Sequence, residues 1–188
     1  MIEKSLILVK HDGVSRGLVG EIIGRFEKVG LKIVGMKMLL ADENMARKHY
    51  KVDKDWAKNV FEKTKITYEK EGKNFAFTNP LEFGKLIQGW NVKFLKEGPV
   101  IAFVVEGPSA VEIVRKIVGN TEPKQASPGT IRGDFAMIES YMLADKKQRV
   151  LRNLVHASDS KENAEREMQL WFSEDEIYDY EKDLDKYF

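Results

Sequence analysis

The chain has 188 residues, of which 43% are hydrophobic and 32% charged, a composition that predicts one globular domain and leaves little room for a second. Its 31 basic and 30 acidic side chains give a net charge of +1, so the overall charge gives little reason to expect nucleic-acid binding. The absence of cysteine excludes disulfides, thiolate catalysis and cysteine-based zinc sites. The apolar run near the N-terminus is too short for a signal sequence or a membrane span, and we expect a cytoplasmic protein without a membrane anchor.

The first elements expected along the chain are a strand, a helix and a second strand. Residues 6–9 (LILV) are typical of a buried strand, which would place Lys10 at its end. From residue 18 onward, apolar side chains recur on one face of a helix, and Gly30 provides its end. Residues 31–40 are rich enough in apolar and branched side chains for a second strand. Asp42 can then cap a short helix that runs to about Tyr50.

The second half of the chain repeats the order of strand and helix. Residues 100–107 (VIAFVVEG) form the clearest strand of the sequence. Ser109 and Glu112 have the spacing of a capping box at the start of the next helix. A last strand is expected to end near His156, and Ser160 can cap a final helix.

The order strand, helix, strand, strand, helix, strand predicts an α+β fold of the ferredoxin-like βαββαβ type. This sandwich has a four-stranded antiparallel sheet with helices on one face. Residues 51–96 and 136–150 fall outside the skeleton, and we interpret them as insertions into a single domain that spans residues 1–188. The first insertion is rich in lysine and aromatic residues, which favours a satellite core with solvated lysines over a groove for single-stranded nucleic acid.

The segment NLVHASDS places His156 where a strand turns into a helix, so its imidazole can be exposed. Imidazole is nucleophilic at neutral pH and can form a phosphoramidate, which suits a two-step transfer. Glu167, in the following helix, could accept the proton of the other ring nitrogen and fix the tautomer. The local sequence alone fits a histidine without a chemical task about equally well.

Three cationic side chains occupy positions that suit a phosphate site. Lys10 follows a strand, Arg115 lies in a helix and Arg132 lies in the loop SPGTIRGDF. Cations stabilise the charge on the oxygens of a transferring phosphoryl group, although each of the three, taken singly, fits a surface charge better. The chain contains neither GxxxxGK[ST] nor GxGxxG, so any anion binding must come from side chains.

Three blocks carry a resemblance to a known family: LVKHDGVSRGLVGEIIGRFE, GNTEPKQASPGTIRGDF and NLVHASDSKENAEREMQLWF. In the order and spacing of these blocks the chain resembles the nucleoside diphosphate kinases. The resemblance implies a ping-pong transfer of the γ-phosphate of a nucleoside triphosphate, typically ATP, to a nucleoside diphosphate through phosphorylated His156. It also implies Mg²⁺ held mainly by the nucleotide phosphates, and a homo-oligomer, most commonly a hexamer.

The resemblance also implies a role for each matching residue. The catalytic set is His156, Glu167, Lys10, Ser158 and Tyr50, and the nucleotide-binding set is Lys10, Arg115, Thr121, Arg132 and Asn153. The chain departs from the family at His11, where proline is usual, and at Ala157, where glycine is usual. We assign no role to His11.

The sequence leaves two questions open. The first insertion falls where the family has the aromatic side chain that stacks on the base, and Trp56 and Phe61 are both candidates for that position. The alternative functions are a nucleotide-binding protein that keeps the fold without the activity, and a protein that binds single-stranded nucleic acid. The presence of His156, Asn153 and Glu167 favours the enzyme.

Overall fold

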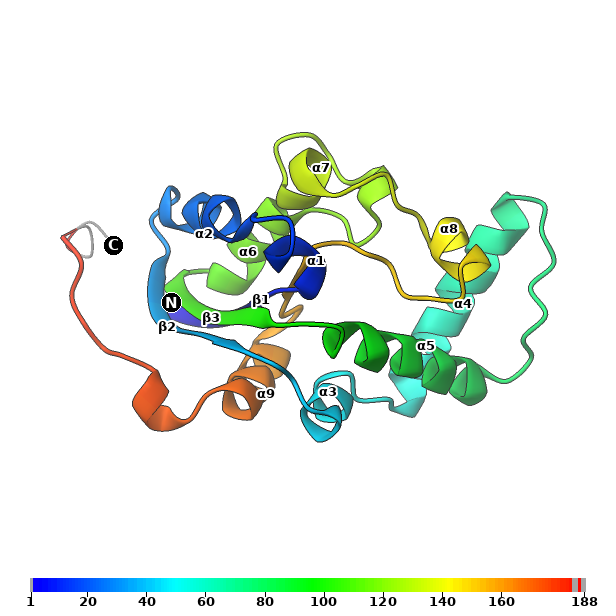
Figure 1. The fold of residues 1–188 in the computed structure, drawn as a ribbon, viewed down its shortest axis with the longest axis horizontal. Helices are drawn as coiled ribbons and strands as arrows, with labels where there is room; N and C mark the ends of the chain where they lie inside the picture. Colours follow the sequence, from blue (N-terminus) through cyan, green and yellow to red (C-terminus); the bar gives the residue numbers. More distant parts are fainter. Residues whose placement is uncertain (1, 184–185, 187–188) are drawn as a thin grey trace.

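The computed structural model describes residues 2–183 and 186. Its centre is a four-stranded sheet in the order β2-β3-β1-β4 (Figure 1). The strands are β1 (Ile2–Val9), β2 (Lys32–Leu39), β3 (Val100–Pro108) and β4 (Val155–Ala157). All neighbouring strands are antiparallel. The predicted ferredoxin-like fold is therefore confirmed.

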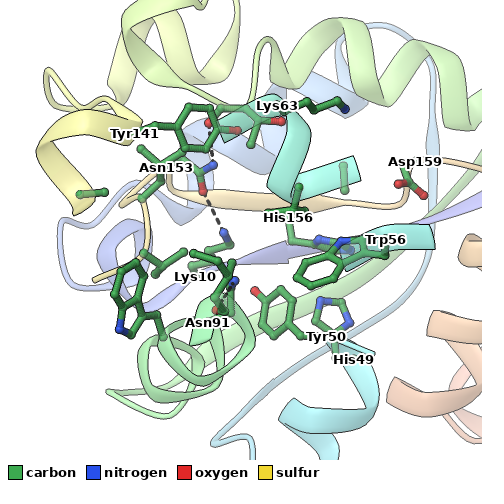
Figure 2. Close-up of a pocket in the computed structure, with 18 of the residues that line it drawn as sticks. Lys10, His49, Tyr50, Trp56, Lys63, Asn91, Tyr141, Asn153, His156 and Asp159 are labelled. Atoms are coloured by element: carbon green, nitrogen blue, oxygen red, sulfur yellow. Dashed lines mark hydrogen bonds between the residues drawn. The ribbon is translucent and has the colours of Figure 1, made fainter. Parts of the chain in front are cut away.

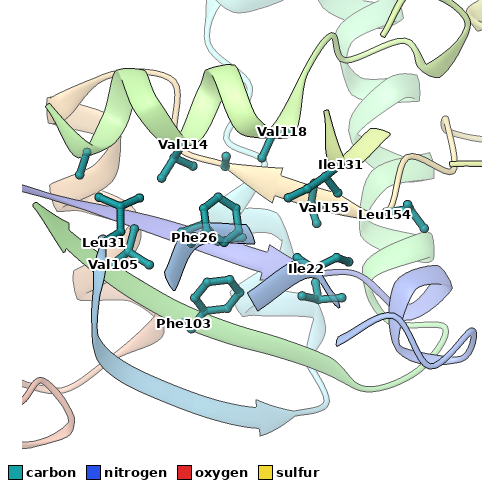
Figure 3. Close-up of a cluster of buried hydrophobic side chains, with 14 residues drawn as sticks. Ile22, Phe26, Leu31, Phe103, Val105, Val114, Val118, Ile131, Leu154 and Val155 are labelled. Carbon is teal, nitrogen blue, oxygen red and sulfur yellow. The ribbon is translucent and has the colours of Figure 1, made fainter. Parts of the chain in front are cut away.

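The two helices of the predicted skeleton cover one face of the sheet. These are α2 (Val19–Glu27) and α6 (Ala110–Val118), whose apolar sides meet the inward side chains of β1 and β3 (Figure 3). Phe26 of α2 and Phe103 of β3 lie in contact, with ring centroids 5.7 Å apart. This layer holds β1 and β4 in register and so fixes the base of the pocket described below.

The other face of the sheet is covered as well, by helices that the predicted layout did not place there. These are α3 (Glu43–His49), α5 (Pro80–Leu95) and α9 (Lys161–Trp171). Along β1, Leu6 and Leu8 point to this layer, whereas Ile7 and Val9 point to the first. Residues 6–9 of β1 are all apolar because both faces of this strand are buried.

The capping residues predicted from the sequence are confirmed at two helix starts. The side chain of Asp42 accepts a hydrogen bond from the N–H of Met45, and that of Ser160 accepts one from the N–H of Asn163. The predicted capping box at Ser109 is wrong. Ser109 adopts a left-handed conformation with φ of 50°, and its hydroxyl makes no capping hydrogen bond. The chain turns too sharply from β3 into α6 for the side chain to reach the helix end.

Helices α4 (Lys54–Lys70), α5 and α8 (Tyr141–Lys146) extend the molecule beyond one end of the sheet (Figure 1). The rings of Phe61, Phe75, Phe77 and Phe83 pack on one another with centroids 4.8 to 6.1 Å apart. The predicted satellite core is thus confirmed for these four rings, whereas Trp56 and Trp90 of the same insertion line the pocket described below. The hydroxyl of Tyr68 in α4 donates to Oδ2 of Asp145 in α8 over 2.9 Å, which links the two segments.

The remaining described elements are short: α1 (His11–Val14), η1 (Pro123–Gln125), α7 (Ile131–Phe135) and η2 (Glu174–Glu176). After η2 the acidic C-terminal stretch runs along β2, where the N–H of Tyr178 donates to the carbonyl of Val34 over 2.7 Å. It therefore lies away from the lysine-rich segment (Figure 1). Within residues 2–183, no helix is both long and apolar enough to span a bilayer.

Candidate active site

A pocket of about 560 Å³ lies between the sheet and the helical extension (Figure 2). Its lining includes eight of the nine predicted site residues: Lys10, Tyr50, Arg115, Thr121, Arg132, Asn153, His156 and Glu167. The ninth, Ser158, lies directly behind the pocket, where it contacts Glu167. Residues separated by up to 157 positions in sequence are thus brought together.

His156 lies on the short strand β4 and its ring is held from behind. Its Nε2 lies 2.9 Å from Oε2 of Glu167, which also accepts a hydrogen bond of 2.6 Å from the Ser158 hydroxyl. Burial would raise the pKa of Glu167, but the contacts with His156, His49 and Ser158 lower it to about 2. An ionised Glu167 keeps the ring proton on Nε2, so Nδ1 carries a free lone pair.

A chain of hydrogen bonds crosses the pocket floor. Nζ of Lys10 donates to Oδ1 of Asn153 over 2.8 Å, and Nδ2 of Asn153 donates to the carbonyl of Thr121 over 2.8 Å (Figure 2). Burial and the nearby Arg132 lower the pKa of Lys10 to about 8, although Asp12 acts in the opposite direction. Lys10 is therefore a buried cation at neutral pH, fixed in direction and available to an anion.

Arg132 is buried and mainly holds the main chain. Its guanidinium donates to the carbonyl oxygens of Asn153, Gly119 and Val155 over 2.7 to 3.1 Å. Burial and Arg115 lower its pKa to about 10, so it stays charged at neutral pH. Three of its five N–H groups are occupied in this way, which leaves two for a ligand. Arg115, by contrast, is exposed at the edge of the pocket.

Asp12 and Leu154 are site residues that the sequence did not reveal. Leu154 has φ of 68°, an uncommon conformation for a residue other than glycine, and it stands between Asn153 and the strand that carries His156. The N–H of Leu154 donates to Oδ2 of Asp12 over 3.1 Å, and the carbonyl of Leu154 accepts a hydrogen bond of 2.7 Å from the N–H of Lys10. Backbone strain of this kind persists where surrounding contacts enforce it, often at functional sites.

Tyr50 and His49 lie at the end of α3, next to His156. The Tyr50 hydroxyl is buried and makes no hydrogen bond to any described residue, and burial raises its pKa, so it is a neutral donor. Polar atoms of His49, His156 and Glu167 lie within 4.8 Å of one another. Nδ1 of His49 already accepts a hydrogen bond from Trp171, and Nε2 of His156 faces Glu167. We therefore assign no metal to this group.

The structure separates the two candidates for stacking on the base. Phe61 belongs to the satellite core, with only 7% of its surface exposed, and does not line the pocket. Trp56 does line it, together with Trp90 of α5, which the sequence did not single out. Which aromatic side chain faces the pocket depends on how its helix is rotated about the helix axis. Residue type alone does not reveal that rotation.

A buried Glu167, an oriented His156 and a cationic floor on a ferredoxin-like sheet are typical of a phosphotransferase site. Residues 3–78 and 84–177 match the family "Nucleoside diphosphate kinase". This chain belongs to the nucleoside diphosphate kinase family and is an enzyme of the phosphotransferase class.

Relatives and solved structures agree with this placement. A nucleoside diphosphate kinase of Pyrobaculum aerophilum is 46% identical over 94% of this chain and 98% of its own, and one of Pyrococcus furiosus is 44% identical over 100% and 93%. A crystal structure of an NDP kinase from Pyrobaculum aerophilum superposes with a TM-score of 0.90 at 44% identity, covering 95% of this chain and all of that one. A transition-state mimic of the Borrelia burgdorferi enzyme, with bound vanadate and ADP, gives 0.78 at 38% identity over 97% and 94%.

Proposed function

We propose that this protein transfers the γ-phosphate of a nucleoside triphosphate, typically ATP, to a nucleoside diphosphate through a phosphohistidine at His156. The observation that carries the proposal is the contact of 2.9 Å between His156 Nε2 and Glu167 Oε2, in a pocket lined by Lys10, Arg115 and Arg132. A carboxylate on one ring nitrogen leaves the other as an oriented nucleophile inside a cationic pocket.

The proposed reaction consists of two successive displacements at phosphorus. In the first, Nδ1 of His156 attacks the γ-phosphorus, a P–N bond forms, and the bond to the β-phosphate oxygen breaks to release the nucleoside diphosphate. In the second, a terminal oxygen of the acceptor diphosphate attacks, a P–O bond forms, and the P–N bond breaks. The proton on Nε2 stays with the ring throughout, and the ionised Glu167 stabilises the positive charge that develops on the ring.

The other pocket residues suit the binding of a polyphosphate. Lys10 and Asn153 face one another at the pocket floor, where they fit the sugar and an adjoining phosphate. Arg115, Thr121 and Arg132 fit the remaining phosphate oxygens, and the free hydroxyl of Tyr50 fits the transferred group. Because the buried carboxylate of Glu167 is committed to His156 and that of Asp12 to the N–H of Leu154, Mg²⁺ would be held mainly by the nucleotide phosphates. When bound, it would neutralise the developing phosphate charge.

We also propose that the chain assembles with itself, most commonly as a hexamer, and works in the cytoplasm with the nucleotide pool as its partner. Met36 and Met38 of β2 are 54% and 59% exposed, and Leu40, which follows the strand, is 68% exposed. Exposed apolar side chains that lie close together favour burial against another subunit. Sedimentation of the purified protein, with Met38→Glu as the variant, measures the assembly: the variant is expected to sediment as a smaller species.

The function is tested by mixing the protein with Mg²⁺ and ATP labelled on its γ-phosphate, without an acceptor. The native protein is expected to acquire an acid-labile, base-stable label, which leaves as labelled GTP when GDP is added. His156→Ala should acquire no label, and His11→Gln, which changes a histidine outside the pocket lining, should acquire it normally. A native protein that binds ATP but never carries the label would instead be a nucleotide-binding protein on the same fold.

A further inference from the structure

A second histidine touches the proposed nucleophile. His49 is the last residue of α3, and its side chain is completely buried. Its ring lies edge-on to that of His156, with centroids 4.3 Å apart and planes at 79° (Figure 2). Tyr50 and Trp171 pack on the same ring with centroids at 4.6 and 5.5 Å. A ring enclosed in this way has little freedom to turn.

The hydrogen bond from Trp171 determines the protonation of this ring. Nε1 of Trp171 lies 3.2 Å from Nδ1 of His49, both of them buried. An indole N–H can only donate, so Nδ1 of His49 must be an acceptor and carries no proton. His49 is therefore neutral with its proton on Nε2, an atom that is buried without a hydrogen-bond partner among the described residues.

Side chains on one face of α9 contact the imidazole rings of both His156 and His49. Glu167 and Trp171 are four residues apart, so their side chains lie one turn apart on the same side of the helix. Glu167 accepts from His156, whereas Trp171 donates to His49. The same helix thus favours the charge that develops on His156 and opposes any charge on His49.

A proton on His49 would disturb the contact between His156 and Glu167. Nδ1 of His49 lies only 4.0 Å from Oε1 of Glu167, so an imidazolium there would compete for the same carboxylate. The other charged or titratable groups that act on His49 are His156 of β4, Lys10 just after β1, Arg166 of α9 and its neighbour Tyr50. Burial, followed by His156, lowers the pKa of His49 well below its usual range, in spite of Glu167.

We infer that His49 is a positioning residue, kept neutral by the N–H of Trp171 so that Glu167 serves His156 alone. This inference rests on the proposed function because it takes His156 as the nucleophile. It assigns to Trp171 a task beyond packing, namely to hold a titratable neighbour of the nucleophile in one tautomer.

The tautomer is observable without any measurement of activity. The chain has three histidines, so ¹⁵N-histidine labelling gives three pairs of ring-nitrogen signals, Nδ1 and Nε2 of each ring, which single substitutions can assign. We expect one ring, missing in His49→Asn, to keep an unprotonated Nδ1 and a protonated Nε2 from about pH 8 down to about pH 5.5, whereas an ordinary histidine would titrate in that range. A His49 signal that titrates near the usual value, or carries its proton on Nδ1, would overturn the inference.

The consequence for the reaction is measured as the rate at which ATP labels His156 at different pH values. Trp171→Phe keeps an aromatic ring but removes the donor that opposes a proton on Nδ1, so the pKa of His49 should rise. Below that new pKa the variant is expected to label about tenfold more slowly than the native protein, because a charged His49 takes Glu167 from His156. The titration of His49 thus adds an inflection to the pH dependence of the labelling rate in Trp171→Phe. Adding His49→Asn, which offers an acceptor but cannot titrate, should remove this inflection.

Phe26→Leu is the matched control for lost packing, because it reduces a buried aromatic side chain in the layer on the other face of the sheet. It should lower stability without any new inflection. If the inflection of Trp171→Phe persists with Asn at position 49, or if Phe26→Leu also shows it, His49 has no positioning role. Failure of the native protein to label at all would refute the proposed function instead, and the histidine signals would still report on the tautomer.

Discussion

The two walls of the pocket are built in different ways. The wall that carries His156 consists of β1, β4 and α9, and its polar groups are tied by buried hydrogen bonds such as Lys10 to Asn153 and Ser158 to Glu167. The facing wall consists of α4, α5 and α8, whose aromatic cluster lies outside the two core layers of the sheet. Tyr68 and Asp145 provide a hydrogen bond between α4 and α8.

This difference indicates a division of labour. Chemistry needs groups fixed within fractions of an ångström, and buried strands with paired polar groups provide that precision. The recognition of a base or sugar tolerates more movement, so it can be provided by a helical segment that has an aromatic cluster of its own. Changes in the first wall should therefore act on turnover, and changes in the second should act on KM or local stability.

The largest effect is expected from Glu167→Gln in the first wall. The amide keeps the shape but loses the charge that stabilises His156, and a hydrogen bond to a charged group contributes about 1.5 to 3 kcal/mol. Labelling of His156 by ATP should slow about 100-fold in a rapid-quench experiment, with Glu165→Gln on the exposed side of α9 as the control. Equal effects of the two variants would mean that Glu167 does not act through His156.

A second effect concerns pH and stability through Lys10. Its pKa falls from 10.5 to about 8 on folding, so between these values the unfolded chain binds more protons than the folded one. The free energy of unfolding should therefore rise with pH across this window, by about 3 kcal/mol, because the folded state favours the neutral amine.

Urea unfolding at both ends of the window measures this contribution. From the lower to the higher pH, the free energy of unfolding of the native protein should rise relative to that of Lys10→Met, which cannot titrate at this position. Nucleotide binding should weaken above about pH 8 as the amine loses its charge. Lys58→Met, an exposed lysine of α4, should behave like the native protein. A native protein and Lys10→Met with parallel pH curves would show that Lys10 is not a buried cation.

The sequence was most informative where the signal is local or repeated along the chain. The strands and the caps at Asp42 and Ser160 depend on patterns within a few residues, and they were predicted correctly. The capping box at Ser109 failed because the turn from β3 puts this residue in a left-handed conformation, which the spacing of two side chains does not record.

The parts of the site that could not be predicted depend on contacts between distant segments. The tautomer of His49 is set by Trp171, 122 residues further on, and the strained Leu154 is held by Asp12, 142 residues earlier. The resemblance named the nine site residues, and eight line one pocket, but it carried no information on what supports them. Support of this kind is a property of packing, which only the folded chain defines.

In the second wall, Trp56→Ala tests which aromatic side chain stacks on the base. A stacked base contributes roughly 1 to 3 kcal/mol, so KM for the nucleotide should rise roughly tenfold while turnover changes little. Steady-state kinetics with ATP and GDP measure both constants. Trp90→Ala is the matched control, since Trp90 also lines the pocket. A rise in KM confined to Trp90→Ala would move the stacking role from α4 to α5.

The smallest effect is expected from Tyr68→Phe, which removes the hydrogen bond to Asp145 but keeps the ring beside Phe75. Loss of this hydrogen bond should cost about 1.5 kcal/mol, the lower end of the range for a charged acceptor, because the carboxylate of Asp145 is only partly buried. Hydrogen exchange should therefore become faster in α8 while His156 labelling stays unchanged, because no hydrogen bond of the first wall involves Tyr68. Slower labelling in this variant would mean that the two walls are coupled and that α8 helps to position the reacting groups.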